Sequence, residues 1–240
     1  MLFRKKSDNH VQIHQGIAEN KRLVQEVIWG QKFYFAIQDS QWLHRTNFNA
    51  SGWALGFPAL YLLYRVLNVV KPKSIIEFGL GESTKMTFQY IGSFPDARLQ
   101  VIEQSQEWLD FIDNEIPDIA MHVKILPIET RIIEGYETII YSNLLENISG
   151  RKYDLVLIDG PVGSPNFSRS QLIDIIENDL LEKDFVILLD DCNRIGERQT
   201  ASRCLDLLKR KGIANSIGFY RGMKTMLIIC SDKYKYLQNF

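Results

Sequence analysis

Cysteine is scarce in this chain of 240 residues, which has only Cys192, Cys204 and Cys230. They form no Cys-x-x-Cys pair and no Cys/His set with ligand spacing, which argues against a disulfide framework and against a structural zinc site. Because a sparse, odd set of thiols is typical of proteins from a reducing compartment, we expect a cytoplasmic location.

The chain also lacks a surplus of charge of either sign, since 28 basic residues oppose 29 acidic ones and leave a net charge of −1. That balance provides no general field to attract nucleic-acid phosphates or anionic lipids. There is no basic tract with interleaved aromatic residues either. We therefore expect no nucleic-acid partner.

Long apolar runs are missing as well. The most apolar stretch, Trp53 to Val70, contains Pro58, Arg65 and Asn68, and its Leu and Tyr residues recur every three or four positions. This spacing predicts a core-facing helix and no membrane span. No apolar segment follows the basic residues near the start of the chain, so we expect no signal peptide.

The length suits one domain, and no internal repeat or low-complexity linker divides it. Residues 11–50 are rich in aromatic residues, show no strand alternation and are expected to be helical. We therefore predict an N-terminal helical extension over residues 1–52 and the main domain over residues 53–240. The extension could cap the site, form a homo-oligomer contact or pack against the flank of the domain.

From residue 71 onward, apolar strand patterns alternate with helical ones. We expect strands at 74–78, 98–103, 121–126, 153–158 and 184–189, with helices at 83–91, 106–112, 170–181 and 199–211. The closely spaced segments 215–220 and 225–230 indicate an antiparallel hairpin. The pattern predicts an α/β fold with a doubly wound, Rossmann-like, mostly parallel sheet that ends in this hairpin.

A glycine-containing loop, Glu77-Phe-Gly-Leu-Gly-Glu-Ser-Thr84, follows the first expected strand. In such sheets ligands bind beyond the carboxyl ends of the strands, where glycines allow the backbone to approach a ligand. The third glycine of the dinucleotide fingerprint is missing and Ser83 stands near its place, which favours a carboxylate-bearing ligand over a pyrophosphate. Glu103 ends the second strand, where a ribose diol would lie, so the two features together indicate nucleoside binding.

These motifs, together with the strand Tyr153-Asp-Leu-Val-Leu-Ile-Asp-Gly-Pro161 and the terminal hairpin, resemble the Rossmann-type (class I) S-adenosylmethionine-dependent methyltransferases over about residues 53–230. More narrowly, four stretches resemble a bacterial subgroup often encoded among surface-polysaccharide genes. They are Lys71-Pro-Lys-Ser-Ile-Ile-Glu77, Gly79-x-Gly-x-Ser-Thr84, Asp159-Gly-Pro161 with Arg169, and Asp190-Asp-Cys-Asn-Arg194 with Glu197.

The resemblance implies S-adenosylmethionine as cofactor and assigns a role to each matching position. Glu77 would approach the amino group of the cofactor, Gly79 and Gly81 would pass beneath it, Ser83 and Thr84 would lie near its carboxylate, Glu103 would bind the ribose hydroxyls, and Asp159 would border it. Residues 126–129 are the stretch expected to flank the adenine.

Three carboxylates are candidates for a catalytic or metal-binding role at the methyl acceptor. Asp159 ends the fourth strand, and Asp190 and Asp191 end the fifth, so adjacent parallel strands would place them on one rim. Hard oxygen ligands in this number suit Mg²⁺, which would lower the pKa of an acceptor hydroxyl. Alternatively, Asp190 and Asp191 only cap the following helix.

Histidine and arginine residues are further candidates, as a general base or as ligands of the acceptor. His44, in the N-terminal extension, is a candidate base, whereas His122 is expected to be a core histidine in the third strand. Arg169, Arg194 and Arg198 border the expected acceptor side and could hold an anionic sugar, although solvated arginines at helix ends are common.

The favoured function is therefore O-methylation of a small-molecule or carbohydrate acceptor, with or without a divalent metal. Two other classes stay open: a nucleoside-binding protein without catalysis, and an NAD-dependent oxidoreductase on the same fold. The missing third glycine, the absence of an evident Tyr/Lys or His catalytic pair and the terminal hairpin speak against the oxidoreductase.

Overall fold

A computed structural model of the chain describes residues 2–50, 52 and 54–240, with side chains described from residue 16 onward. Trp53, where the apolar stretch begins, lies outside the described residues. Within them, no helix has the length and apolar character needed to cross a membrane.

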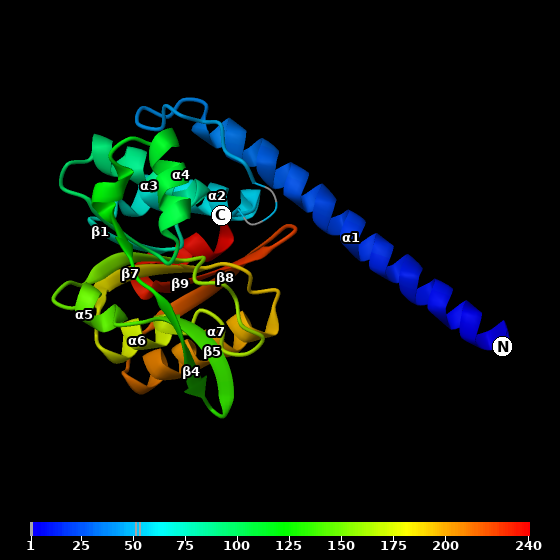
Figure 1. The fold of residues 1–240 in the computed structure, drawn as a ribbon. Coiled ribbons are helices and arrows are strands. Elements are labelled where there is room, and N and C mark those ends of the chain that lie inside the picture. Colours follow the sequence, from blue (N-terminus) through cyan, green and yellow to red (C-terminus); the bar gives the residue numbers. More distant parts are fainter. Residues whose placement is uncertain (1, 51, 53) are drawn as a thin grey trace.

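The described chain alternates helices and strands (Figure 1). The strands are β1 (Ser74–Phe78), β2 (Arg98–Glu103), β3 (Val123–Ile125), β4 (Ile128–Ile133), β5 (Tyr136–Tyr141), β6 (Tyr153–Ile158), β7 (Leu181–Leu189), β8 (Asn215–Arg221) and β9 (Thr225–Ser231). The α-helices are α1 (Leu2–Ile37), α2 (Phe57–Val70), α3 (Glu82–Ser93), α4 (Gln106–Glu115), α5 (Leu144–Ile148), α6 (Gln171–Glu177) and α7 (Ile195–Arg210), joined by the 3₁₀ segments η1 (Ile119–His122) and η2 (Asp232–Asn239).

Seven strands form one twisted sheet in the order β3-β2-β1-β6-β7-β9-β8. All neighbours pair in parallel except β9, which runs antiparallel to both β7 and β8. The doubly wound, mostly parallel sheet with its C-terminal hairpin is therefore confirmed. Chain progression reverses between β1 and β6, and at such a switch point the loops diverge and leave room for a ligand.

Successive side chains of each strand point to opposite faces of the sheet, so the core consists of two layers. Ile75, Leu155 and Leu157 pack with α2, α3, α4 and the end of α1, whereas Ile76 and Val156 pack with α5, α6 and α7. Helices therefore cover both faces (Figure 1), and the central strands consist of apolar residues on both faces because both faces are buried.

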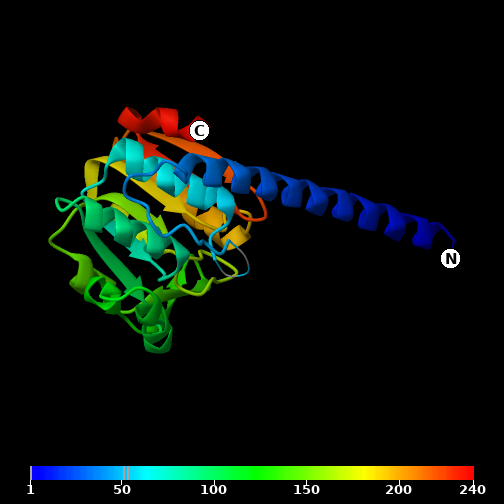
Figure 2. The ribbon, with the colours of Figure 1, turned by 90° about the horizontal axis from the view of Figure 1, so that it is seen from above.

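Helix α1 leaves the body of the molecule as a long rod, with the N-terminus at its far end (Figures 1 and 2). Its C-terminal part is anchored, since Phe33 and Ile37 are buried and the Trp29 indole donates to the Arg221 carbonyl at 3.0 Å. Val24 and Phe35 are exposed, and the expected oligomer contact stays a prediction. The helix ends at Ile37, so the expectation of helix through residue 50 is wrong for residues 38–50.

The sequence-based expectations omit the hairpin of β4 and β5. These strands pair antiparallel around a two-residue turn in which Glu134 and Gly135 have φ values of 51° and 85°. Two consecutive positive φ values are those of a type I′ hairpin turn, which Gly135 favours. The hairpin returns Tyr141 to the carboxyl edge of the main sheet.

Candidate active site

Polar residues follow β1, β6 and β7 at one edge of the sheet. The hydrogen-bond ladder continues one residue past each strand: Gly79 N–H donates to Ile102 O at 2.9 Å, Asp159 N–H to Phe78 O at 2.9 Å and Asp190 N–H to Ile158 O at 3.0 Å. These bonds hold Gly79, Asp159 and Asp190 side by side at the switch point.

Gly79 and Gly160 are in direct backbone contact at this edge. Gly79 has a φ of +93°, and a Cβ added to it would lie 3.1 Å from the Gly160 nitrogen. A Cβ added to Gly160 would lie 2.9 Å from the Gly79 nitrogen. Gly81 differs, since a Cβ there would meet nothing within 4 Å. Gly79 is thus required by backbone geometry, whereas Gly81 leaves open space beside the loop.

Glu103 joins the end of β2 to the glycine loop. Its side chain is buried, and Oε2 accepts a hydrogen bond from the Leu80 N–H at 2.9 Å. Oε1 accepts from the N–H groups of Gln104 and Ser105 at 2.8 and 2.9 Å. Since each carboxylate oxygen has about two lone pairs, Oε2 can accept one further donor.

Glu77 lies inside a cluster of hydroxyl groups from the first turns of α3. Oε1 accepts from Ser83 and, at 3.0 Å, from Thr84, and Oε2 accepts from Thr87 at 2.9 Å. The Thr84 hydroxyl also accepts from the Gly81 N–H at 3.0 Å. Burial raises the pKa of Glu77 from 4.5 to about 7, although the three hydroxyls lower it. Glu77, Ser83 and Thr84 therefore brace the loop against α3 in this structure.

A buried arginine connects the aspartates after β6 and β7. Arg169 Nη2 lies 3.0 Å from Asp159 Oδ1 and 2.7 Å from Asp191 Oδ2. Asp191 adopts a φ of 59°, a left-handed conformation that aspartate tolerates better than most residues. Lys224 Nζ approaches Asp190 Oδ2 at 3.5 Å, and Arg194 Nη1 pairs with Asp191 at 3.0 Å. The cluster therefore contains its own cations.

One carboxylate oxygen from each of Asp159, Asp190 and Asp191 lies within 4.8 Å of the others. Oδ1 of Asp190 and Oδ1 of Asp191 are buried without a hydrogen-bond partner among the described residues, as is Nη1 of Arg169. Buried polar atoms are normally satisfied, so the two carboxylate oxygens point to a missing donor or cation, whereas Arg169 Nη1 is itself a donor and lacks an acceptor. Three hard oxygen donors fit a divalent cation such as Mg²⁺.

The three aspartates differ in accessibility. The side chain of Asp159 is 17% exposed, against 0% for Asp190 and 3% for Asp191. Burial raises the pKa of Asp159 well above its usual value, an effect that Asp190 strengthens and Arg169 opposes. Asp159 is therefore the most exposed carboxylate of the three.

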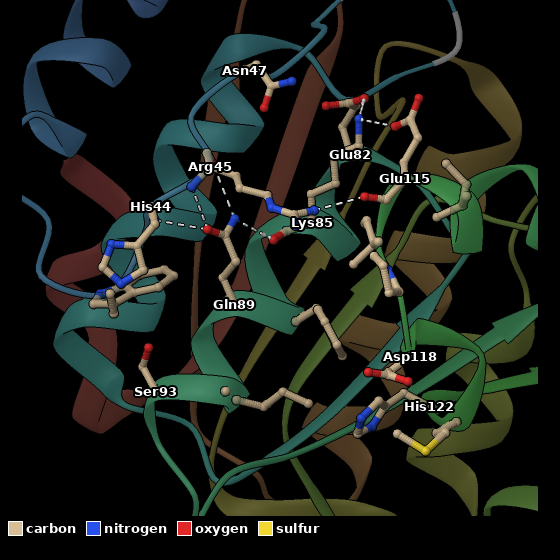
Figure 3. Close-up of a pocket in the computed structure, with 18 of the residues that line it drawn as sticks. His44, Arg45, Asn47, Glu82, Lys85, Gln89, Ser93, Glu115, Asp118 and His122 are labelled. Atoms are coloured by element: carbon tan, nitrogen blue, oxygen red, sulfur yellow. Dashed lines mark hydrogen bonds and ion pairs between the residues drawn. The ribbon is translucent and has the colours of Figure 1, made fainter.

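His44 lies apart from this cluster, in a groove of about 1260 Å³ between α3, α4 and the segment after α1 (Figure 3). The His44 and Arg45 N–H groups donate to Gln89 Oε1 at 2.9 and 2.7 Å, which fixes the segment on α3. His122, expected in a strand, ends η1 at the other end of the groove, half-buried against Phe88 at 5.5 Å between ring centroids. The structure thus brings the aspartates together but not His44 with them.

Sequence reasoning missed two residues at the edge, Gln104 and Tyr141. The Tyr141 hydroxyl donates to Gln104 Oε1 at 3.1 Å and lies against Gly160. The only signal for Tyr141 was its position at the end of an unrecognised hairpin. In the stretch expected to flank adenine, the Leu126 N–H donates to Glu103 O at 2.9 Å, whereas residues 128 and 129 belong to β4.

No protein-family model matches the chain, and no curated protein sequence matches it significantly. Among solved structures, it is similar to the O-methyltransferase TomG from Streptomyces achromogenes, which is involved in tomaymycin synthesis and was solved with S-adenosylmethionine. The TM-score is 0.54, the identity is 13%, and the match covers 89% of this chain and 98% of TomG. The chain has a Rossmann-like methyltransferase fold.

Two other methyltransferase structures match more weakly. One is precorrin-6y C5,15-methyltransferase from Geobacter metallireducens, with a TM-score of 0.47, 14% identity and coverage of 77% of this chain and 93% of that one. The other is the S-adenosylhomocysteine-bound methyltransferase PaMTH1 from Podospora anserina, with a TM-score of 0.44, 13% identity and coverage of 85% and 87%. The methyltransferase fold thus rests on the likeness to TomG.

Proposed function

We propose that this protein is an S-adenosylmethionine-dependent methyltransferase that methylates a hydroxyl group of a small-molecule or carbohydrate acceptor. The observation that carries the proposal is the bond from the Leu80 N–H to Glu103 Oε2, which places the acid after β2 against the glycine loop after β1. In a doubly wound sheet, this is where a nucleoside ribose and the adjoining chain of the ligand lie.

The cofactor would lie over the loop, with a ribose hydroxyl donating to the remaining lone pair of Glu103 Oε2. The open space beside Gly81 would accommodate the amino-acid portion, and the N-terminus of α3 attracts a carboxylate. Glu77, Ser83 and Thr84 would act by keeping the loop and the start of α3 in place, since they bind one another.

The acceptor would lie beside Asp159, whose backbone bond to Phe78 places it next to the glycine loop. Methyl transfer is a displacement at a sulfonium methyl, so the main task of the protein is to align the acceptor oxygen, methyl carbon and sulfur, worth roughly 7–11 kcal/mol of barrier. A hydroxyl must also lose its proton, and Asp159, the most exposed of the three aspartates, would accept it.

A divalent cation would be held by Asp159, Asp190 and Asp191, whose oxygens lie close enough together. Such an ion lowers the pKa of a hydroxyl bound to it. Arg169 would keep Asp159 and Asp191 in position from the protein side. We expect Mg²⁺ to raise the melting temperature of the protein and Asp190→Asn to abolish that rise; an identical rise in the variant would exclude this site.

The three cysteines are free and buried. Because free, unpaired thiols are typical of proteins from a reducing compartment, the proposal includes a cytoplasmic location.

The proposal is tested by calorimetric titration with S-adenosylhomocysteine and, separately, with NAD. We expect saturable binding of the first ligand only, and a loss of about tenfold or more in Glu103→Ala, because a hydrogen bond to a charged group is worth roughly 1.5–3 kcal/mol. Glu107→Ala, four residues further on and exposed, is the matched control and should bind normally. Binding of NAD alone would support the oxidoreductase alternative, and no binding of S-adenosylhomocysteine to folded protein would refute the proposal.

A further inference from the structure

A second cavity lies beside the aspartate cluster, where α1, the start of α7 and the turn between β8 and β9 meet. Its volume is about 530 Å³. Such a volume is within the range of roughly 300–1,000 Å³ typical of small-molecule sites.

Four cationic side chains from three elements line this cavity: Lys21 and Arg22 from α1, Arg198 from α7 and Arg221 from β8. No acidic side chain lines it among the residues that the structure describes. Within the same residues, none of the four cations makes an ion pair. Because the whole chain carries a net charge of −1, this concentration of positive charge is a local feature.

The carboxylates near the cavity do not pair with its four cations. Glu26 accepts hydrogen bonds from the N–H groups of Phe57 and Met223 at 2.6 and 2.7 Å, which ties α1 to the β8–β9 turn. Asp190 and Asp191 pair with the cations of their own cluster. Among the side chains that the structure describes, four positive charges therefore meet at this cavity and no acidic side chain pairs with them.

The cavity adjoins the candidate active site along the chain. Cys192 and Asn193, which follow the two aspartates directly, are part of its wall. Thr225, the first residue of β9, is fixed there by two bonds: its carbonyl accepts from the Cys192 N–H at 2.8 Å, and its N–H donates to Asn193 Oδ1 at 3.2 Å. A ligand in this cavity would thus lie next to the carboxyl edge of β7.

We propose that this cavity binds the phosphate or diphosphate group of the methyl acceptor, as in a nucleotide-activated or phosphorylated sugar. The inference rests on the proposed function and specifies the class of its acceptor. Guanidinium groups bind phosphate oxygens through two parallel hydrogen bonds, and Arg198 and Arg221 bring two such groups to one cavity from separate elements. The Arg221 guanidinium lies 5.0 Å from the ring centre of Phe219, which restricts its orientation.

The experiment is calorimetric titration of the full chain with inorganic pyrophosphate at low ionic strength, in parallel with S-adenosylhomocysteine. We expect wild-type protein to bind pyrophosphate, and the double variant R198A/R221A to bind it at least about tenfold more weakly. Both residues are exposed, so the variant should fold. Arg210→Ala, an exposed arginine at the other end of α7, is the matched control and should leave the affinity unchanged.

A second variant, R198K/R221K, keeps the charge but removes the paired donors, and we expect intermediate affinity. Unchanged affinity in R198A/R221A, or no pyrophosphate binding by the wild-type protein, would overturn the proposal. S-adenosylhomocysteine should bind equally to wild type and R198A/R221A. If it binds to neither while pyrophosphate still depends on the arginines, the methyltransferase function fails and so does the assignment of the anion to a methyl acceptor.

Discussion

The protonation of Glu77 makes a quantitative prediction about stability. Its pKa is about 7 in the folded protein and 4.5 in an unfolded chain. Between these values the folded state keeps a proton that the unfolded state releases, so the free energy of unfolding falls as pH rises through the window. The contribution is fully present below pH 4.5 and lost above pH 7. At about 1.4 kcal/mol per pH unit, the loss amounts to ~3 kcal/mol.

Glu77→Gln should remove this dependence. Glutamine keeps the shape of the protonated acid, and its oxygen can still accept from Ser83 and Thr84. Its amide requires an acceptor, which Thr87 can provide by redirecting its own hydroxyl to the carbonyl of Ser83 or Thr84, 3.4 and 3.3 Å away. From pH 4.5 to pH 8, we therefore expect the wild type to lose ~3 kcal/mol more of its free energy of unfolding than the variant does.

Urea denaturation followed by circular dichroism at several pH values measures this difference. Glu107→Gln, at an exposed position, is the control and should follow the wild-type pH profile. Parallel profiles for wild type and Glu77→Gln would refute the reasoning, because they would show that Glu77 does not gain its proton on folding.

Two further substitutions test the geometry of the edge. In thermal denaturation, Gly79→Ala should destabilise the protein by roughly 1–3 kcal/mol, because alanine is strained at this positive φ and its Cβ would press against Gly160. Gly92→Ala is the control: it lies in helix α3, its added Cβ would meet nothing within 4 Å, and it should be neutral or stabilise the protein by up to about 1 kcal/mol. Arg169→Ala should cost about 3–5 kcal/mol in urea denaturation, since it removes the ion pair of Asp159 and the shortest ion pair of the buried Asp191. A loss as small as that of the exposed Arg210→Ala would show that Arg169 does not neutralise them.

The regular part of the fold was readable because its signals are local. The runs 155–158 and 185–189 are uninterrupted and apolar, and the structure has buried strands there within β6 and β7. The hairpin of β4 and β5 escaped because it lies outside the main sheet and β4 is mostly exposed, so only the second half of β5 carries a burial pattern. The helix of the extension was expected, but its end at Ile37 was not, since neither glycine nor proline follows.

Local periodicity and turn chemistry are properties of the sequence by itself. The sequence therefore determined where most strands and helices follow one another along the chain, that both faces of the sheet are buried, and that the loop after β1 requires a glycine. The tertiary structure alone decided which partners the polar residues find. The pairing of Arg169 with Asp159 and Asp191 and the convergence of Lys21 with Arg221 depend on strand order and helix packing. Residues as far as 200 positions apart in the chain, such as Lys21 and Arg221, meet at one cavity, and no repeat along the chain encodes their meeting.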